Sequence, residues 1–488
     1  MDNEIRIGTN RQLFLDEFWV SNANNISRKL HSPDRREPVI EADHPWEKGF
    51  VGFSTTSYDG EKYRMWYKCE DSSIIGVPMH SYRKQAYAES DDGINWNKPL
   101  LRQVEFEGSM ENNLLAANPG VVGLDKNPDA KKDERFKAFK IVRDQPKLPK
   151  DPNNLTWQEK LDQRRTRSSG IVAMASPDGI NWHQMYKEPI LNEWPFDSEN
   201  LYFWDQWIGQ YRGYTRGIAN HNPNVDPSTV ASEIGHEFYG GVRWVRHTTS
   251  TDFKNWSPLK NIETGATSFE HLYTNYCWPY ERAPGTYLMF PSRYVAHRMP
   301  DPDWFDGTGV NDIVFLSSRD GVNFDRSFME AFIRPGLDKR NWHERGIYFL
   351  HGIFQTSPTE LTMYVGEHLK TPGVHIRRYT IRPDGFVSVN AGYCGGEFTT
   401  RPFTFEGNQL ELNYSTSAVG SVKVEIQDYK GNAIPGFSLA DCPKMFADLI
   451  DGKVAWDNEG DLSSLSGKPI RLRFSLMDAD IYAFKFNK

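Results

Sequence analysis

Ser176-Pro-Asp-Gly-Ile-Asn-Trp182 is the clearest of four segments that share the pattern Ser-x-Asp-x-x-Asn-aromatic. The others are Ser90-Asp-Asp-Gly-Ile-Asn-Trp96, Ser250-Thr-Asp-Phe-Lys-Asn-Trp256 and Ser318-Arg-Asp-Gly-Val-Asn-Phe324. A degenerate fifth copy, Arg382-Pro-Asp-Gly-Phe386, keeps the Asp-Gly turn but moves the aromatic residue. The aspartate and glycine favour a tight turn, and the aromatic residue is expected to pack between neighbouring sheets.

The spacing of these copies predicts a propeller. Their aspartates are separated by 86, 74, 68 and 64 residues, a period that fits a four-stranded blade with long loops. The aspartates are Asp92, Asp178, Asp252, Asp320 and Asp384. Alternating, hairpin-like strand patterns lie upstream of them, at residues 50–58 with 63–67, 201–207 with 211–215, and 272–277 with 287–290. The sequence therefore predicts an all-β chain that begins with a five-bladed β-propeller.

A different pattern follows the last copy. After Gly395-Gly396, strand patterns continue at 410–414, 422–428, 471–476 and 481–486 without the repeat, which favours a small C-terminal β-sandwich. The expected domains are a propeller over residues 1–394 and a sandwich over 395–488. One helical pattern, at residues 156–167, lies in a charged insertion between Arg143 and Ser169 and is either a short polar helix or a solvated loop.

Composition excludes several classes of protein. The 488-residue chain has a formal net charge of -8, so it lacks electrostatic support for nucleic-acid binding. No run of about 18 apolar residues suggests a membrane span. The four cysteines (Cys69, Cys277, Cys394 and Cys442) form no CxxC pair and are expected to be buried free thiols. The N-terminus lacks the pattern of a secretory signal, which leaves open an intracellular protein or one whose signal has been removed.

Several segments resemble a known group of enzymes. They are Arg11-Gln-Leu-Phe-Leu-Asp-Glu17, Lys62-Tyr-Arg-Met-Trp-Tyr67, Tyr287-Leu-Met-Phe-Pro-Ser-Arg293 and Arg377-Arg-Tyr-Thr-Ile-Arg-Pro-Asp-Gly385. With the five repeats and the C-terminal strands, they resemble the five-bladed propeller glycoside hydrolases, the group that holds families 32 and 43. The Asn-Asp-Pro-Asn, Arg-Asp-Pro and Glu-Cys motifs of the invertase-like family are absent, so a fructan-cleaving role is not supported. The repeats also look like sialidase Asp boxes, but the Phe-Arg-Ile-Pro strand of sialidases is missing.

Glycosidic cleavage needs two carboxyl groups across one pocket, and the starts of a propeller's inner strands converge on one funnel. Acids precede the first turn of several blades: Glu47 lies 13 residues before Gly60, Asp197 and Glu199 lie 12 and 10 before Gly209, and Glu270 lies 15 before Gly285. Glu111 and Glu344 hold comparable places in the second and fifth blades. Asp16 is a further candidate, on an N-terminal segment expected to close the fifth blade. Resemblance to family 43 implies an acid on the third blade, where Asp197 and Glu199 share a face if the strand is regular.

The expected substrate-binding residues are aromatic, basic or amide side chains near these acids. Arginine matches anionic groups through its planar fork, and aromatic rings stack on sugars. The set comprises Trp46, Asn113, His271, Tyr273, Arg282, Arg293 and His351, with Arg216, Trp204 and Trp278 as further candidates. The alternatives are ion pairing between blades for the arginines and core packing for the aromatic residues. No metal-ligand spacing such as HExxH occurs, so neither a metal nor a cofactor is predicted.

Together these patterns predict a glycoside hydrolase that acts on a terminal or short-oligosaccharide bond, with a carbohydrate as its partner. Glu47 would be the base or nucleophile, Asp197 or Glu199 the acid, and Glu270 a tuning or binding group. Two alternatives remain open: a glycoside phosphorylase on the same fold, and a non-catalytic carbohydrate-binding propeller.

Overall fold

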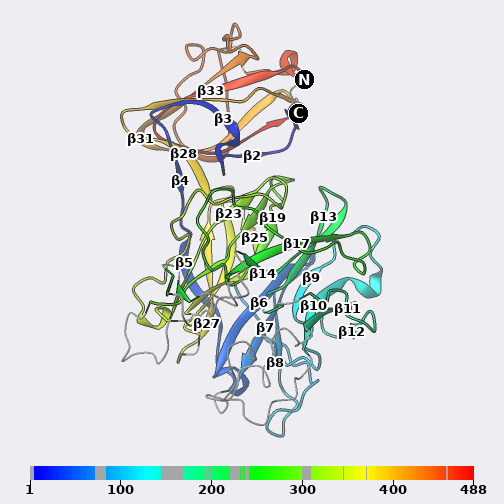
Figure 1. Ribbon diagram of the computed structural model, residues 1–488. Helices are drawn as coiled ribbons and strands as arrows, with labels where there is room; N and C mark the ends of the chain where they lie inside the picture. The colour runs from blue at the N-terminus through cyan, green and yellow to red at the C-terminus, as the bar shows by residue number, and fades with distance from the viewer. Residues whose placement is uncertain are drawn as a thin grey trace.

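The protein is almost entirely β-structure in two parts (Figure 1). The computed structural model describes residues 5–71, 84–143, 169–193, 196–197, 199–219, 231–232, 235–236, 241–298, 309–343, 346–369, 371–457 and 460–488. Over these residues the only helices are short 3-10 turns, so none is long and apolar enough to span a membrane. The helix considered at 156–167 and the candidate Glu344 lie outside the described residues.

The strands of the larger part fall, mostly in chain order, into five groups that we call units, and the first and fifth units are joined in one seven-stranded sheet. The first unit contains β6 (Phe50–Tyr58), β7 (Tyr63–Glu70) and β8 (Lys84–Ser90). The second contains β9 (Val121–Leu124), β10 (Phe136–Arg143), β11 (Ser169–Ser176) and β12 (His183–Gln184). The third contains β13 (Leu201–Asp205), β14 (Gln210–Ala219), β17 (Val242–Ser250) and β18 (Lys260–Asn261). The fourth contains β19 (Cys277–Pro279), β20 (Tyr287–Met289), β23 (Leu316–Ser318) and β24 (Phe324–Asp325). The fifth contains β25 (Ile347–Ser357), β26 (Glu360–Glu367), β27 (His375–Ile381) and β5 (Asp34–Glu41).

The innermost strands of these units follow one another in a closed circle. Strand β6 packs against β9, β9 against β13, and β19 against β25. The third and fourth units meet where the ring of Phe203 stacks on that of Tyr287 at 6.3 Å. The circle closes where β25 pairs in parallel with β6, through His351 and Thr55. Two small hairpins, β15 (Ala231–Ser232) with β16 (Gly235–His236) and β21 (Ser292–Val295) with β22 (Val310–Ile313), stand beside the units.

The repeated segments form the turn that the sequence predicts. In the second unit, the Asp178 carboxylate accepts hydrogen bonds from the backbone amides of Ile180 and Asn181, both at 2.8 Å. The Asn181 side-chain amide and the Ser176 hydroxyl donate to the same carboxylate. The turns at Asp92, Asp252 and Asp320 repeat these contacts.

Each of these turns packs on the preceding unit. Trp66 Nε1 donates to the Gly179 carbonyl at 2.6 Å, and the Tyr214 hydroxyl donates to the Gly321 carbonyl at 2.7 Å. The Tyr364 hydroxyl of the fifth unit donates to the Gly93 carbonyl of the first, which continues the pattern across the closure of the circle. In the third unit Phe253 replaces the glycine, and its ring packs on Phe139 of the second unit at 5.6 Å. The repeat is thus the joint between neighbouring units.

The smaller part combines both ends of the chain in one ten-stranded sheet system. Its strands are β1 (Ile5–Gly8), β2 (Gln12–Leu13), β3 (Val20–Asn24), β4 (Ser27–Leu30), β28 (Val387–Ala391), β29 (Gly396–Thr400), β30 (Phe403–Phe405), β31 (Gln409–Asp428), β32 (Asp448–Lys453) and β33 (Ile470–Asn487). The four strand patterns expected at 410–414, 422–428, 471–476 and 481–486 are parts of two long strands, β31 and β33, which pair with each other over most of their length. Register shifts bend this pairing rather than end it.

These pairings differ from the expected division at residues 394 and 395. Strand β4 pairs with β28, and β1 pairs with β30, so residues 5–30 lie with the C-terminal strands. The segment that completes the fifth unit is β5, which pairs antiparallel with β27. Asp16 is therefore not on the closing strand: it caps the 3-10 turn Glu17–Trp19 and forms an ion pair with Arg319. Sequence patterns indicate strands, whereas pairing partners far along the chain decide which sheet a strand joins.

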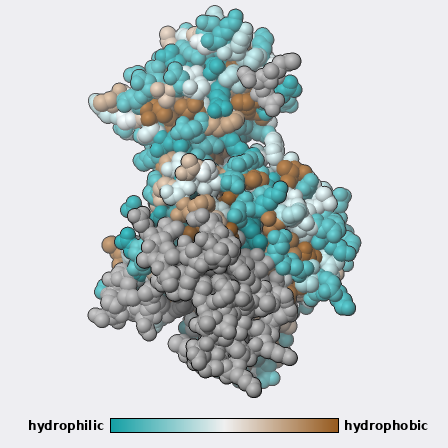
Figure 2. All heavy atoms as spheres, in the orientation of Figure 1, coloured by the Kyte–Doolittle hydropathy of each residue, from teal (hydrophilic) through white to brown (hydrophobic). Residues whose placement is uncertain are grey.

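Three of the four cysteines lie in the hydrophobic cores. Cys69, Cys277 and Cys442 are buried free thiols, but Cys394 is exposed, which corrects the expectation for that residue. Hydrophilic residues cover most of the coloured surface in Figure 2, and hydrophobic residues form small patches, several of them near the waist between the two parts.

Candidate functional site

The predicted carboxyl groups precede the innermost strands. Glu47 ends a 3-10 turn (Pro45–Glu47) before β6, Asp197 and Glu199 lie directly before β13, and Glu270 lies seven residues before β19. In a ring whose inner strands run the same way, these segments lie at one end, which we call the entry end. Glu111, expected to hold a comparable place in the second unit, is exposed.

Glu47 is completely buried in a polar network of the first unit. Its Oε1 accepts from the Tyr67 hydroxyl at 2.6 Å, and its Oε2 accepts from Lys98 Nζ at 2.8 Å and from the His44 amide at 3.2 Å. Burial raises the pKa of the Glu47 carboxyl, and the Lys98 ammonium opposes that shift. Protein donors therefore occupy both carboxylate oxygens of Glu47, as is typical of a buried carboxyl group with a structural role.

Trp46 and Asn113 belong to the same network. The indole Nε1 of Trp46 donates to Asn113 Oδ1 at 3.0 Å, and Asn113 Nδ2 donates to the Tyr67 hydroxyl at 2.7 Å. The Trp46 ring is stacked on the His44 ring at 4.6 Å, and only 9% of the residue is exposed. These contacts join the first unit to the segment that leads into the second. Both residues thus support the position of Glu47.

Glu199 has the most unusual backbone of the candidates. It is 2% exposed and has a φ of 66°, a left-handed conformation that is uncommon for a residue with a side chain. Its backbone carbonyl accepts from Asn275 Nδ2 at 2.9 Å. The Tyr276 hydroxyl interacts with the Glu199 carboxylate, and burial, followed by this carboxylate, raises the pKa of that hydroxyl. Strained backbone of this kind is concentrated at functional sites.

Asp197 has a different environment from Glu199. Its side chain is 33% exposed, and its Oδ2 accepts from Arg216 Nη1 at 3.2 Å. Asn200 Nδ2 donates to the Asp197 carbonyl at 2.5 Å, which fixes the bend before β13. The left-handed turn at Glu199 breaks the regular strand on which the two acids would share a face. The structure therefore gives different environments to the two carboxyl groups that the sequence left equivalent.

Two arginines enclose Tyr273. The guanidinium carbons of Arg216 and Arg243 each lie 4.9 Å from the centre of the Tyr273 ring, and Arg216 Nη2 donates to the Tyr273 carbonyl at 2.7 Å. The Arg243 amide donates to His271 Nδ1 at 3.0 Å. Arg246 lies close by, because its Nε donates to the Arg216 carbonyl at 2.9 Å. Tyr273 and His271 therefore lie beside Arg216, which also contacts Asp197. The arginines form a cluster of cations near one carboxylate.

Burial is the main cause of the pKa shifts in this cluster. Burial lowers the pKa of Arg243, and the neighbouring Arg216 adds to that effect. Burial likewise lowers the pKa of Arg246 to about 10. Sequence reasoning missed Arg243 and Arg246. The signal was the density of arginine on the two strands β14 and β17, whose pairing sets Arg216 opposite Val245.

Glu270 and Arg293 form a separate ion-pair network. Arg326 Nε donates to Glu270 Oε1 at 2.8 Å, and Arg293 Nη1 lies 3.4 Å from Glu270 Oε2. Arg293 also makes a two-pronged pair with Asp312, at 2.8 and 2.5 Å. Arg293 and Asp312 are directly opposite each other on β21 and β22. Pairing of this completeness is typical of a structural ion pair, the alternative that the sequence left open.

Arg282 and His351 lie at the other end of the ring, which we call the exit end. Both line a cavity formed where the innermost strands end. Arg282 pairs with Asp384 at 2.9 and 3.1 Å. Burial lowers the pKa of His351 to about 3, so its ring is neutral near pH 7 and unsuited to protonating a substrate.

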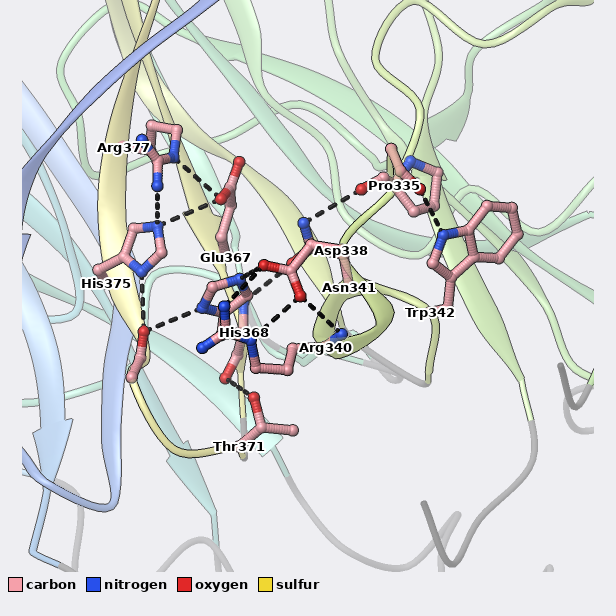
Figure 3. A network of polar contacts seen from close by, with 12 residues as sticks. Pro335, Asp338, Arg340, Asn341, Trp342, Glu367, His368, Thr371, His375 and Arg377 are labelled. Atoms are coloured by element: carbon pink, nitrogen blue, oxygen red, sulfur yellow. Dashed lines mark hydrogen bonds and ion pairs between the residues drawn. The ribbon is translucent and has the colours of Figure 1, made fainter. Parts of the chain in front are cut away.

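A further polar network lies in the fifth unit and was not anticipated (Figure 3). Its centre is Glu367, which is fully buried and accepts hydrogen bonds from His375 and Arg377 on β27. Next to it, His368 contacts Asp338, whose carboxylate also accepts from Arg340. Burial would raise the pKa of Glu367, but His375 and Arg35 outweigh it and lower that pKa. The charges are paired within the network, which ties the segment 335–342 to β26 and β27.

No family model matches the chain, and no curated protein sequence matches it. The structure is similar to several solved ones. One is a glycoside hydrolase family 43 arabinoxylan arabinofuranohydrolase from Bacillus subtilis, with 10% identity, 94% of this chain and 99% of that chain covered, and a TM-score of 0.38. A fructofuranosidase from Schwanniomyces occidentalis has 11% identity, the same two coverages and a TM-score of 0.39. A member of the GH130 family of mannoside phosphorylases and glycoside hydrolases has 13% identity, with 73% and 95% covered and a TM-score of 0.41. These similarities are too distant to carry an argument about activity.

Proposed function

We propose that the chain is a glycoside hydrolase that cleaves a terminal or short-oligosaccharide bond at the entry end of a five-bladed propeller, with the smaller part as a β-sandwich. The observation that carries this proposal is Glu199. A carboxyl group that is 2% exposed, held in a left-handed backbone and set beside the Tyr276 hydroxyl has the burial expected of a general acid.

Asp197 supplies the contrasting carboxylate. Its side chain is 33% exposed and contacts the Arg216 guanidinium, whereas Glu199 is only 2% exposed. Two carboxyl groups with such different environments fit the division between acid and base that glycosidic cleavage requires. Glu47 and Glu270 have the weaker case, because lysine, tyrosine and arginine donors already occupy their oxygens.

The test is a series of amide variants, assayed on whichever aryl glycosides and short oligosaccharides the wild type cleaves. Glu199→Gln should lower kcat by about 10²- to 10⁴-fold, the usual contribution of a general acid, with little change in Tm. Glu47→Gln is the matched comparison, because it disturbs a buried network and should lower Tm. Unchanged kcat in Glu199→Gln would reject this site. A wild type that binds oligosaccharides without cleaving any would favour the non-catalytic binding propeller.

A phosphorylase is the second candidate, and the arginine cluster favours it. Arg216 and Arg243 lie against the same Tyr273 ring near Asp197, and an anion such as phosphate would offset the repulsion between these two cations. An acidic sugar would do the same for a hydrolase. Product analysis with and without inorganic phosphate separates the two reactions: a phosphorylase releases a sugar phosphate, and Arg243→Gln should then raise the KM for phosphate. A product that is always the free sugar would exclude phosphorolysis.

A further inference from the structure

The exit end of the ring holds a cavity of about 550 Å³. All five innermost strands contribute to its lining as they end, through Tyr58, Leu124, Asp205, Pro279 and Gln355. The candidate acids precede the starts of these same strands, so the cavity is distinct from the proposed catalytic site. Its volume lies within the range of small-molecule pockets, about 300 to 1,000 Å³.

Aromatic side chains stand at the rim of this cavity. Trp207 is 58% exposed and Tyr58 is 42% exposed, while Trp204 and Trp278 are half-buried. The backbone of Trp207 is held in place, because the Asp205 carboxylate accepts from the Trp207 backbone amide at 3.1 Å. A Cβ added to Gly285 would lie only 3.0 Å from the indole, so the ring rests on that backbone. A large exposed aromatic ring fixed beside a cavity is a platform for stacking.

The charges around the cavity are balanced. Lys126 pairs with Glu281, Arg282 with Asp384, and the buried Asp205 accepts from Arg212 at 2.9 Å. These pairs leave the cavity without a charge of either sign to recognise. An anionic or cationic ligand therefore gains little here, whereas a neutral one avoids the cost of desolvating a charge.

His351 lies at the inner end of the cavity. It is 3% exposed, and among the described residues neither of its ring nitrogens has a hydrogen-bond partner. Its ring meets the edge of Trp278 at 4.7 Å. A neutral imidazole carries one donor and one acceptor, the same pair of functions as a hydroxyl group. A buried polar group without a protein partner is costly unless a ligand or water satisfies it.

We propose that this cavity binds a neutral sugar ring, stacked on Trp207, at a site separate from the entry end. The apolar face of a sugar matches the indole, and its hydroxyl groups match a lining of neutral polar atoms and paired charges. The proposal goes beyond the proposed function and does not depend on it, because a chain without catalytic activity would hold the same cavity.

The experiment titrates the full chain with cellobiose, lactose, maltose and xylobiose by calorimetry and saturation-transfer NMR, with glucuronate and phenol as charged and apolar comparisons. At least one disaccharide should bind. Trp207→Ala should weaken that binding by about tenfold, the loss expected for one stacking contact, and Trp207→Phe should restore most of it. Tyr429→Ala removes an equally exposed aromatic ring, at 55%, from the smaller part and should change nothing.

Three results would overturn the proposal: no disaccharide binds, the binding is insensitive to Trp207→Ala, or glucuronate or phenol binds more tightly than every disaccharide. Glu199→Gln separates the two ends of the molecule. Binding at the exit end should survive in Glu199→Gln, whatever happens to turnover. Loss of turnover with retained, Trp207-dependent binding would support both sites, and absence of turnover with such binding would reject only the hydrolase.

Discussion

Asp252 illustrates how single residues hold the outer turns. Its carboxylate accepts from the Lys254 and Asn255 amides, the Asn255 side chain and the Ser250 hydroxyl, at 2.7 to 3.1 Å. Partial burial would raise the pKa of Asp252, but these donors outweigh it and lower the pKa to about 2. The equivalent Asp92 also has a pKa of about 2, lowered in the same way against the effect of burial. The turn is more stable when its aspartate is ionised.

A pH dependence follows from this shift. The folded pKa of Asp252, about 2, lies below its ordinary value of 3.8, so its contribution to stability is present above 3.8 and is lost as pH falls through about 2. Asp252→Asn should reduce the free energy of unfolding at neutral pH by about 1 kcal/mol, the value of comparable side-chain caps. Urea unfolding of both proteins across this pH range measures the difference. A difference in the free energy of unfolding that stays constant down to pH 2 would contradict this stabilising role of the ionised Asp252.

At the scale of elements, the repeat brings a turn glycine against the preceding sheet. Gly179 has a φ of 77°, and its carbonyl accepts from Trp66 Nε1. A Cβ at this position would lie 2.6 Å from Trp66 Cζ2, closer than any real contact. The glycine is thus required twice, once by the backbone conformation and once by the neighbouring ring.

Gly179→Ala should therefore destabilise the ring by more than backbone strain alone. The left-handed conformation costs about 1 to 2 kcal/mol for alanine, and overpacking adds about 1 to 3 kcal/mol. Gly209→Ala is the control, because Gly209 also has a positive φ, 63°, but has no atom within 4 Å of an added Cβ. Thermal unfolding of the two variants should show the larger loss in Gly179→Ala. Equal losses would mean that the contact with Trp66 contributes nothing.

At the scale of the whole molecule, Asp384 links the ring to the smaller part. This fifth aspartate of the repeat is fully buried and does not form the turn of the other four. It accepts instead from Tyr280 and Arg282 of the fourth unit, at 2.7 and 2.9 Å, and pairs with Arg11 of the N-terminal segment at 3.1 Å. Burial would raise its pKa, but Arg282 and Arg11 lower it. Asp384, the fifth aspartate of the repeat, therefore links the ring to the smaller part instead of forming a turn.

Asp384→Ala should uncouple the two parts. It leaves Arg282, Arg11 and the Tyr280 hydroxyl without their shared acceptor, and breaking a buried pair of this kind costs about 3 to 5 kcal/mol. Calorimetry should show a lower Tm and a transition that splits in two. Asp178→Ala, in the repeat turn between the first and second units, should give a smaller loss and a single transition. A single, unshifted transition in Asp384→Ala would show that other contacts hold the parts together.

The sequence by itself determined the repeat, its turn and the all-β character, because that turn chemistry needs only residues within about five positions of one another. Pairing over the whole chain decided the rest. Residues 5–30 join the C-terminal strands, and Arg282 pairs with Asp384, since both depend on partners a hundred or more residues away. The left-handed backbone of Glu199, which interrupts the regular strand between it and Asp197, is likewise a tertiary feature. No local rule places a glutamate at positive φ, and only the surrounding contacts hold it there.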